Sequence, residues 1–198
     1  MKILIIGGHG TIGRYLVDYF SDKHEVVTAG RTRGDFIVDM AQSNSIEQLF
    51  DQTGQLDAII VVAGEAKWAP FNELAEEDYY VGFSSKLMGQ VNVARYGRSK
   101  LSPGGSVTLS TGILADDPVR TTASAAMVNG ALHSFVKAVA LELEGVRINA
   151  VAAGVVQDSF DKYRSYFPGH NPVPMETVAR AYERSVLGAG NGEIIRVY

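Results

Sequence analysis

A buried strand that runs into a glycine turn opens the chain and constrains its fold more than any other feature. Residues 3–6, Ile-Leu-Ile-Ile, form an apolar run that is typical of an interior parallel strand. Gly7, Gly10 and Gly13 follow, and an amphipathic helical pattern begins directly behind them. Gly7 permits a tight turn, Gly10 leaves room for a phosphate, and Gly13 lets the helix approach the strand. The opening segment therefore predicts a dinucleotide-binding strand–turn–helix unit.

Strand-like and helix-like segments alternate along the whole chain. We expect strands at residues 3–6, 25–29, 36–38, 57–62, 106–109, 147–151 and 193–197. We expect helices at residues 11–23, 45–53, 76–99, 123–143 and 176–188, and irregular stretches at 65–72, 113–122 and 158–174. This alternation predicts an α/β fold, with one doubly wound domain over residues 1–198 and helices on both faces of a parallel sheet.

The composition disfavours several classes of function. The formal net charge of −4 and the absence of a Lys/Arg run disfavour nucleic-acid binding. The chain has no cysteine, which removes disulfides, thiolate metal sites and thiol catalysis. No pair of its 4 histidines has metal-ligand spacing, so we expect no metal site. No apolar run reaches the ~20 residues of a membrane helix, and the first run is too short for a secretory signal. We therefore expect a soluble, cytoplasmic protein without membrane contact.

The end of the second expected strand indicates which dinucleotide the turn would take. A site selective for NAD places an acid about 20 residues beyond the glycine turn, where it holds the ribose 2′-hydroxyl. Residues 28–33 are Thr-Ala-Gly-Arg-Thr-Arg and include no acid. Arg31 and Arg33 are suited to pairing with a 2′-phosphate, so we expect NADP(H) to be preferred over NAD(H). The alternative is that both arginines are solvated loop residues. Asp39 either accepts from the adenine amino group or caps a turn.

Further segments occur in the order that a known family shows. They are Val-Ala-Gly at residues 62–64, Gly-Ser-Val-Thr-Leu-Ser-Thr at 105–111, Ala-Leu-His-Ser-Phe-Val-Lys at 131–137 and Arg-Ile-Asn-Ala-Val-Ala-Ala-Gly at 147–154. With the glycine turn and Asp39, they resemble the short-chain dehydrogenase/reductase family over nearly the whole chain. The resemblance implies a seven-stranded doubly wound sheet, a nicotinamide cofactor and a small-molecule substrate. It also implies homodimers or homotetramers formed through the two long helices.

The glycine turn and the resemblance together imply a cofactor site at the carboxyl ends of the strands. The expected members are Gly7, His9, Gly10, Thr11, Ile12, Gly13, Arg31, Arg33, Asp39, Ala63, Gly64, Gly154 and Val156. His9 contacts phosphate or adenine in this interpretation, and it is an exposed turn residue in the alternative.

The family's catalytic positions are mostly replaced in this chain. In the family, a Tyr-x-x-x-Lys pair transfers the proton as hydride moves, and the Lys lowers the pKa of the Tyr. That pair aligns here with Ala125 and Asn129, neither of which can perform the transfer. The family's helix Asn aligns with Lys86, and its hydroxyl residue aligns with Thr111 or, less closely, Ser110. The hydroxyl is the one position that keeps similar chemistry.

The candidate catalytic residues are thus Thr111, Ser110, Lys86 and Asn129, and each has a structural alternative. A partly buried Lys86 would have a lowered pKa and act as an acid, whereas an exposed one would lie along the helix surface. Asn129 would hold the nicotinamide ribose or contact the loop backbone. The hydroxyls of Thr111 and Ser110 would bond a substrate carbonyl or cap the backbone.

Functions of different classes are compatible with these residues. The first is an NADP(H)-dependent oxidoreductase for a small carbonyl or alcohol, with the proton supplied by Lys86, by Tyr163 or Tyr166, or by water. The alternative is a non-catalytic NADP(H)-binding sensor or regulatory protein, which the loss of the Tyr and Lys favours. A lyase or isomerase on the same scaffold is a third possibility.

Overall fold

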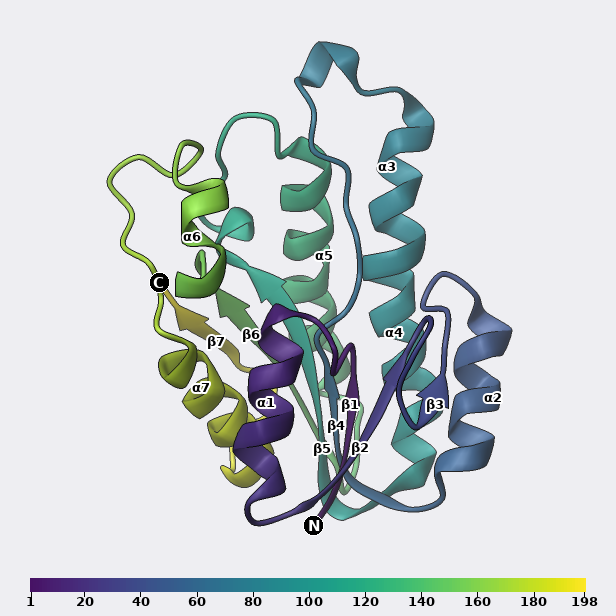
Figure 1. Ribbon diagram of the computed structural model, residues 1–198. Helices are drawn as coiled ribbons and strands as arrows, with labels where there is room; N and C mark the ends of the chain where they lie inside the picture. The colour runs from purple at the N-terminus through teal and green to yellow at the C-terminus, as the bar shows by residue number, and fades with distance from the viewer.

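Seven parallel strands lie in one sheet in the computed structural model, which describes residues 1–198 (Figure 1). The strands are β1 (Lys2–Ile6), β2 (Glu25–Gly30), β3 (Phe36–Ile37), β4 (Leu56–Val61), β5 (Leu101–Gly112), β6 (Arg147–Ala153) and β7 (Ile194–Val197). Their order across the sheet is β3-β2-β1-β4-β5-β6-β7. The chain starts in the middle, winds to one edge, and then returns to wind to the other, which confirms the doubly wound α/β fold. Its switch point lies between β1 and β4, where ligands bind in such sheets.

Helices cover both faces of this sheet and enclose two apolar cores (Figure 1). The helices α1 (Thr11–Ser21) and α7 (Met175–Leu187) cover one face, and α2 (Ser43–Thr53), α4 (Gly89–Gly97) and α5 (Ala123–Val139) cover the other. Ile3 and Ile5 face the α1/α7 core, while Leu4 and Ile6 face the opposite core. Because both faces are covered, β1 is apolar at every one of these positions. None of the helices is both long enough and apolar enough to cross a membrane.

The helical stretch expected at residues 76–99 is confirmed, but it contains a π-helical turn that the sequence did not predict. It consists of α3 (Glu76–Gly82), a π-helical turn over Phe83–Met88, and α4. The widened turn lays Lys86 against Gly64, where a Cβ on the glycine would lie 2.8 Å from the Lys86 Cα. Turns of this kind are frequent at functional sites. A periodic apolar pattern predicts that the segment is helical but does not distinguish one π-helical turn within it.

Two other segments differ from the sequence-based expectation. The short helix α6 (Gln157–Tyr163) occupies part of the stretch at residues 158–174 that was expected to be irregular. Its seven residues are too few for a helical period to stand out. Strand β5 begins at Leu101 rather than at residue 106, because Pro103 and Gly104 hide the strand pattern.

Candidate functional site

The glycine turn after β1 has the geometry of a phosphate-binding loop. Gly7 has a φ of +89°, and a Cβ there would lie 2.6 Å from the Val62 carbonyl oxygen. A Cβ on Gly13 would lie 2.1 Å from the Gly7 carbonyl oxygen, so a side chain cannot fit. Gly10 differs, because the nearest atom to its Cβ would be 3.4 Å away, an ordinary contact. The fold therefore requires glycine at positions 7 and 13, whereas Gly10 leaves open space at the start of α1. No side chain caps this helix, so its first N–H groups face that space.

A smaller cavity of about 130 Å³ lies beside β2, where the adenosine end of a dinucleotide is expected. Arg31 and Glu65 line it, and they form an exposed ion pair of 2.9 Å. Asp39 also lines it, and its Oδ1 accepts from the Ala41 N–H at 3.0 Å, which is the turn-capping contact that its alternative predicted. Arg33 is exposed and has no ion pair.

An acid that the sequence analysis did not identify folds back onto β2. The carboxylate of Asp35 accepts from the Thr28 N–H at 2.8 Å and from the Thr28 hydroxyl at 2.9 Å. These hydrogen bonds lower the pKa of Asp35, with a smaller contribution from nearby His9. The His9 Nε2 atom is buried and has no hydrogen-bond partner. A carboxylate therefore lies in the same loop as the two arginines, although its oxygens are engaged with Thr28.

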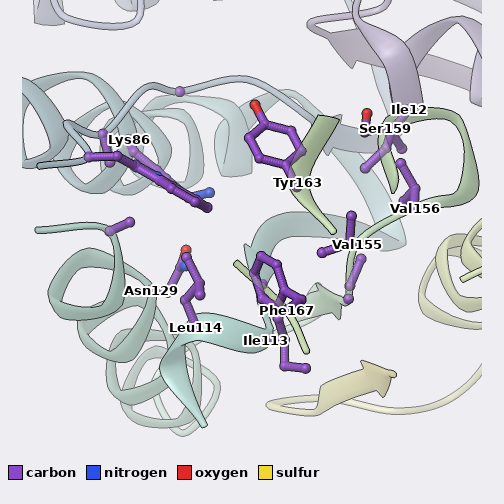
Figure 2. Close-up of a pocket in the computed structure, with 17 residues that line it drawn as sticks. Ile12, Lys86, Ile113, Leu114, Asn129, Val155, Val156, Ser159, Tyr163 and Phe167 are labelled. Carbon is purple, nitrogen blue, oxygen red and sulfur yellow. The ribbon is translucent and has the colours of Figure 1, made fainter. Parts of the chain in front are cut away.

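A second candidate site is a large cavity of about 380 Å³ above the carboxyl ends of the central strands (Figure 2). It joins residues that are far apart in the sequence. They are Ile12, Gly64, Ala66, Trp68, Lys86, Gly112, Ile113, Leu114, Ala125, Asn129, Ala153, Gly154, Val155, Val156, Ser159, Tyr163 and Phe167. Four members of the expected cofactor site and two of the expected catalytic residues thus line one space.

Lys86 and Asn129 are the polar groups at the inner end of this cavity. Lys86 reaches into it from the π-helical turn (Figure 2), and no hydrogen bond or ion pair joins its amine to another residue. Burial alone lowers the pKa of Lys86 from 10.5 to about 8. Asn129 is buried on α5, and its Oδ1 has no hydrogen-bond partner. Two unsatisfied polar groups in one apolar cavity are typical of a ligand site, since unpaired buried polar atoms are otherwise costly.

The two strand-end hydroxyls point away from the cavity, in opposite directions. The Thr111 hydroxyl lies 2.9 Å from Nε2 of His133 on the α5 side of the sheet. The Ser110 hydroxyl contacts the Val61 carbonyl oxygen and lies 2.6 Å from the hydroxyl of buried Tyr182 in α7. Adjacent residues of a strand face opposite sides of its sheet, so both cannot reach the same site. At this strand end the cavity wall is formed by Gly112, Ile113 and Leu114 instead, and a catalytic role for either hydroxyl stays a prediction.

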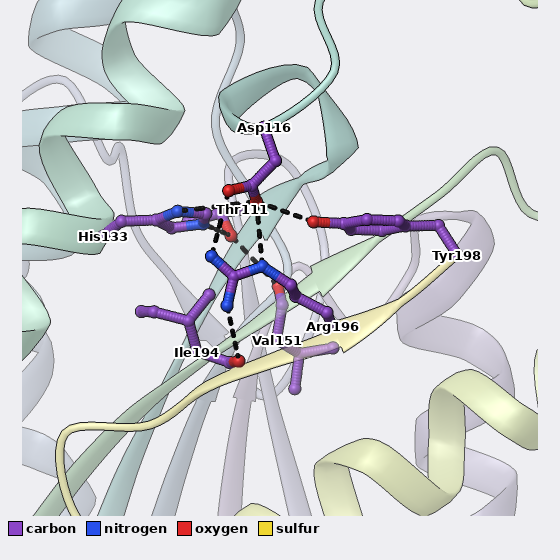
Figure 3. A network of polar contacts seen from close by, with 7 residues as sticks. All are labelled: Thr111, Asp116, His133, Val151, Ile194, Arg196 and Tyr198. Carbon is purple, nitrogen blue, oxygen red and sulfur yellow. Dashed lines mark hydrogen bonds and ion pairs between the residues drawn. The ribbon is translucent and has the colours of Figure 1, made fainter.

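His133 belongs to a polar network behind that wall (Figure 3). Its Nδ1 lies 3.9 Å from the carboxylate of Asp116. Asp116 also accepts from the Arg196 guanidinium at 2.9 Å and from the Tyr198 hydroxyl at 2.7 Å. The hydrogen bond from Arg196 is the main reason that the pKa of Asp116 is lowered. The network ties the end of the chain to the turn after β5, and no sequence spacing indicated it.

Aromatic side chains form part of the cavity wall. Tyr163 from α6 lies with its ring centroid 5.5 Å from that of Trp68, and Phe167 is buried beside them. Tyr166 also contacts Trp68, at 5.7 Å, but does not line the cavity. Of the two tyrosines proposed as proton donors, Tyr163 is therefore the one in the cavity wall.

Comparison with known proteins places this geometry in a family. A family model described as Enoyl-(Acyl carrier protein) reductase matches residues 17–179. Hydroxynaphthalene reductase arp2 of Aspergillus fumigatus is 31% identical over 128 residues, 63% of this chain and 47% of that protein. Short-chain dehydrogenase/reductase ATR9 of Stachybotrys chlorohalonatus is 28% identical over 186 residues, 77% and 72% of the two chains. The chain spans about half the length of the first curated relatives that it matches.

Solved structures give the same result over the full chain. The crystal structure of the protein lin1944 from Listeria innocua is 46% identical, with each chain covered completely and a TM-score of 0.98. A small-chain dehydrogenase in complex with NADPH is 26% identical, with 100% and 96% of the two chains covered and a TM-score of 0.89. The matched model, the relatives and the fold agree with the motifs in the sequence: the protein belongs to the short-chain dehydrogenase/reductase family, whose members are oxidoreductases.

Proposed function

We propose that the protein is an NADP(H)-dependent oxidoreductase that acts on a small carbonyl or alcohol through a non-standard active site. The observation that carries this proposal is the composition of the large cavity. Ile12 and Gly64, from the expected cofactor site, line it together with Lys86 and Asn129. A nicotinamide held by the first group would thus lie beside the second.

The residues present fit a dinucleotide. The open space at Gly10 and the uncapped start of α1 suit a pyrophosphate, and the unpartnered Nε2 of His9 is close by in the same turn. Arg31 and Arg33 suit a 2′-phosphate, and a structural relative in complex with NADPH supports that choice. When bound, the cofactor supplies or accepts the hydride.

The side chains in the cavity then have separate tasks. Lys86 stabilises negative charge on the substrate oxygen and gives it a proton, because a pKa of about 8 keeps the amine mostly protonated yet ready to release its proton near neutral pH. The unpartnered Oδ1 of Asn129 accepts from a ribose hydroxyl. Tyr163 is the alternative proton donor. Thr111 and Ser110 support the cavity wall through His133 and Tyr182.

Two measurements test the proposal. Calorimetry with the purified protein should show tighter binding of NADPH than of NADH, and equal or reversed affinities would contradict the cofactor assignment. A panel of aldehydes, ketones and quinones with NADPH should contain a substrate. With that substrate, Lys86→Ala should lower kcat, whereas Lys67→Ala should not, because Lys67 is exposed and lies outside the cavity.

The second candidate function is a non-catalytic NADP(H)-binding sensor. Ala125 and Asn129 favour it, because they stand where the family has its proton-transferring Tyr and its Lys. Tight binding of NADPH without turnover of any member of the panel would support the sensor over the enzyme.

We also propose a homodimer or homotetramer formed through the long helices. Exposed apolar side chains on this part of the surface support it, among them Tyr80 and Met127, which are 53% and 46% exposed. Light scattering of the purified protein should give a multiple of the 21.3 kDa chain mass, and a monomer would contradict the proposal.

A further inference from the structure

The large cavity contains one charged group and nothing in its walls that balances the charge. Lys86 is the only charged residue among the 17 that line it, and no carboxylate faces its amine. Burial is the sole cause of the lowered pKa of Lys86, since no charged or hydrogen-bonding neighbour contributes. An unpaired ammonium in apolar surroundings is destabilising, and an incoming anion would relieve that cost.

Packing holds the first part of the Lys86 side chain in place. The backbone of Lys86 is fixed in the π-helical turn, and its Cα, Cβ and Cγ all lie against Gly64, where an added Cβ would be 2.8, 2.9 and 3.0 Å from them. Figure 2 shows the side chain extending from there into the cavity. The fold therefore directs the positive charge into the cavity, although part of Lys86 stays accessible to solvent.

The remaining walls suit a flat apolar body. Eleven of the 17 lining residues are hydrophobic, and they include the rings of Trp68, Tyr163 and Phe167. The centroids of Trp68 and Tyr163 lie 5.5 Å apart, with their planes inclined by 45°. Aromatic walls of this kind favour planar ligands. Tyr163 is the only other titratable group in the wall, so a cationic ligand would find no counter-charge.

We propose that the cavity binds a flat, apolar ring compound that carries one oxyanion, with the oxyanion on Lys86 and the ring among Trp68, Tyr163 and Phe167. The oxyanion belongs to a phenolate or enolate, or to a carboxylate. Hydrogen bonds between an ammonium and an oxyanion are stronger than neutral ones, above all in a site of low polarity. The inference rests on the proposed function in one respect: a phenolate or enolate that takes up a proton from water at a ring carbon becomes the ring ketone, and that ketone, with the same oxygen on Lys86, is the form that would accept the hydride.

The experiment uses the full chain without cofactor and three probes that share one ring. They are 4-nitrophenol, whose ionised form is coloured, 4-nitrobenzoate, and 4-nitroanisole, which cannot ionise. Bound 4-nitrophenol should ionise at a lower pH than free 4-nitrophenol, as followed by visible absorbance. Calorimetry should show that 4-nitroanisole binds roughly tenfold more weakly than the ionised probes, as expected when a charge-assisted hydrogen bond is lost. A preference for 4-nitrobenzoate indicates a carboxylate ligand, and a preference for ionised 4-nitrophenol indicates a phenolate or enolate.

Variants assign the effect to the amine. Lys86→Met keeps the length of the side chain and should remove both the shift in ionisation and the preference for ionised probes, whereas Lys86→Arg should retain them. Lys67→Met is the matched control and should behave as the wild type, because Lys67 is exposed and outside the cavity. Circular dichroism checks that each variant is folded.

Three results would overturn the inference: equal affinity for 4-nitroanisole and the ionised probes, an unchanged shift in Lys86→Met, or no binding of any ring probe. An NADPH titration of the same preparations separates this inference from the proposed function. Binding of the ionised probes without binding of NADPH contradicts only the proposed function. Binding of NADPH without selective binding of the ionised probes contradicts only the present inference.

Discussion

The hydroxyl of Thr111 lies 2.9 Å from Nε2 of His133, and this contact holds the strand-end hydroxyl on the α5 side of the sheet, outside the cavity (Figure 3). From His133 the network continues through Asp116 to Arg196 and Tyr198. The turn that supplies the cavity wall is thereby fixed to the last strand of the sheet. The hydroxyl of Thr111, which the sequence predicted to be catalytic, thus contacts the network that supports the cavity wall.

Replacing His133 should destabilise the fold. His133→Ala removes a buried ring and leaves the Thr111 hydroxyl without its closest partner, so we expect a loss of about 1–3 kcal/mol in the free energy of unfolding. Urea denaturation measures it. His170→Ala is the control, because His170 pairs with exposed Asp117 at the surface and should cost less than about 1 kcal/mol. Equal losses in the two variants would contradict a structural role for the network.

The same histidine should make stability depend on pH. Burial lowers the pKa of His133 below its ordinary value of 6.5, although Asp116 acts in the opposite direction. Below pH 6.5 the imidazole of His133 takes up a proton in the unfolded chain more readily than in the folded chain. The contribution of neutral His133 to the free energy of unfolding is therefore complete above pH 6.5 and is lost as the pH falls. His133→Gln cannot take up this proton. The stability advantage of the wild type over His133→Gln should therefore shrink between about pH 8 and about pH 5.5 in urea denaturation series. A constant difference would show that His133 does not titrate as described.

Two glycines of the first turn should respond differently to alanine. Gly13→Ala should disrupt the turn and lower the melting temperature, because its Cβ would lie 2.1 Å from a backbone oxygen. Gly10→Ala should keep the melting temperature but weaken NADPH binding, because its Cβ meets only an ordinary 3.4 Å contact yet enters the expected phosphate space. Gly130→Ala serves as a control in α5, where an added Cβ contacts nothing within 4 Å. Unchanged NADPH affinity in Gly10→Ala would place the phosphates elsewhere.

Glu65 should limit the affinity for NADPH. Its carboxylate pairs with Arg31 at 2.9 Å and competes with a 2′-phosphate for that guanidinium. Glu65→Gln should therefore bind NADPH up to about fivefold more tightly, the range that an exposed ion pair allows, with little change for NADH. Calorimetry with both cofactors measures the ratio. Glu73→Gln removes an exposed acid outside both cavities and should leave the ratio unchanged.

Removal of the Lys86 charge should stabilise the protein near neutral pH. The pKa of Lys86 is about 8 in the folded chain against an ordinary value of 10.5, so between these values the unfolded chain holds a proton that the folded chain has released. The free energy of unfolding of the wild type should consequently rise between about pH 8 and pH 10.5. Below about pH 8 the buried amine is charged, and its full destabilising effect applies. Lys86→Met avoids that cost and should melt at a higher temperature at neutral pH, with the gap closing as the pH rises. Lys67→Met should show no such gap, and a less stable Lys86→Met would indicate that the amine has a partner.

The sequence by itself determined the parts of the protein that depend on local pattern. The apolar run before Gly7 predicted a strand covered on both faces, and the glycine spacing predicted the turn. The alternation of strands and helices predicted the doubly wound sheet, and the motifs predicted the family, which the comparisons confirmed. These features were accessible because strand burial, turn conformation and helix period each depend on residues that are close together in the chain.

The tertiary structure alone decided which candidate side chains share a site. Lys86 and Asn129 line one cavity. The π-helical turn directs Lys86 into it, and the packing of α5 against the sheet places Asn129 there. Thr111 and Ser110 are adjacent, yet they face opposite sides of the sheet, where distant His133 and Tyr182 meet them. A side chain's direction depends on the exact residue at which a strand or helix turn is placed, and its partner comes from another part of the chain. The local pattern of residue types determines neither the direction of a side chain nor its partner.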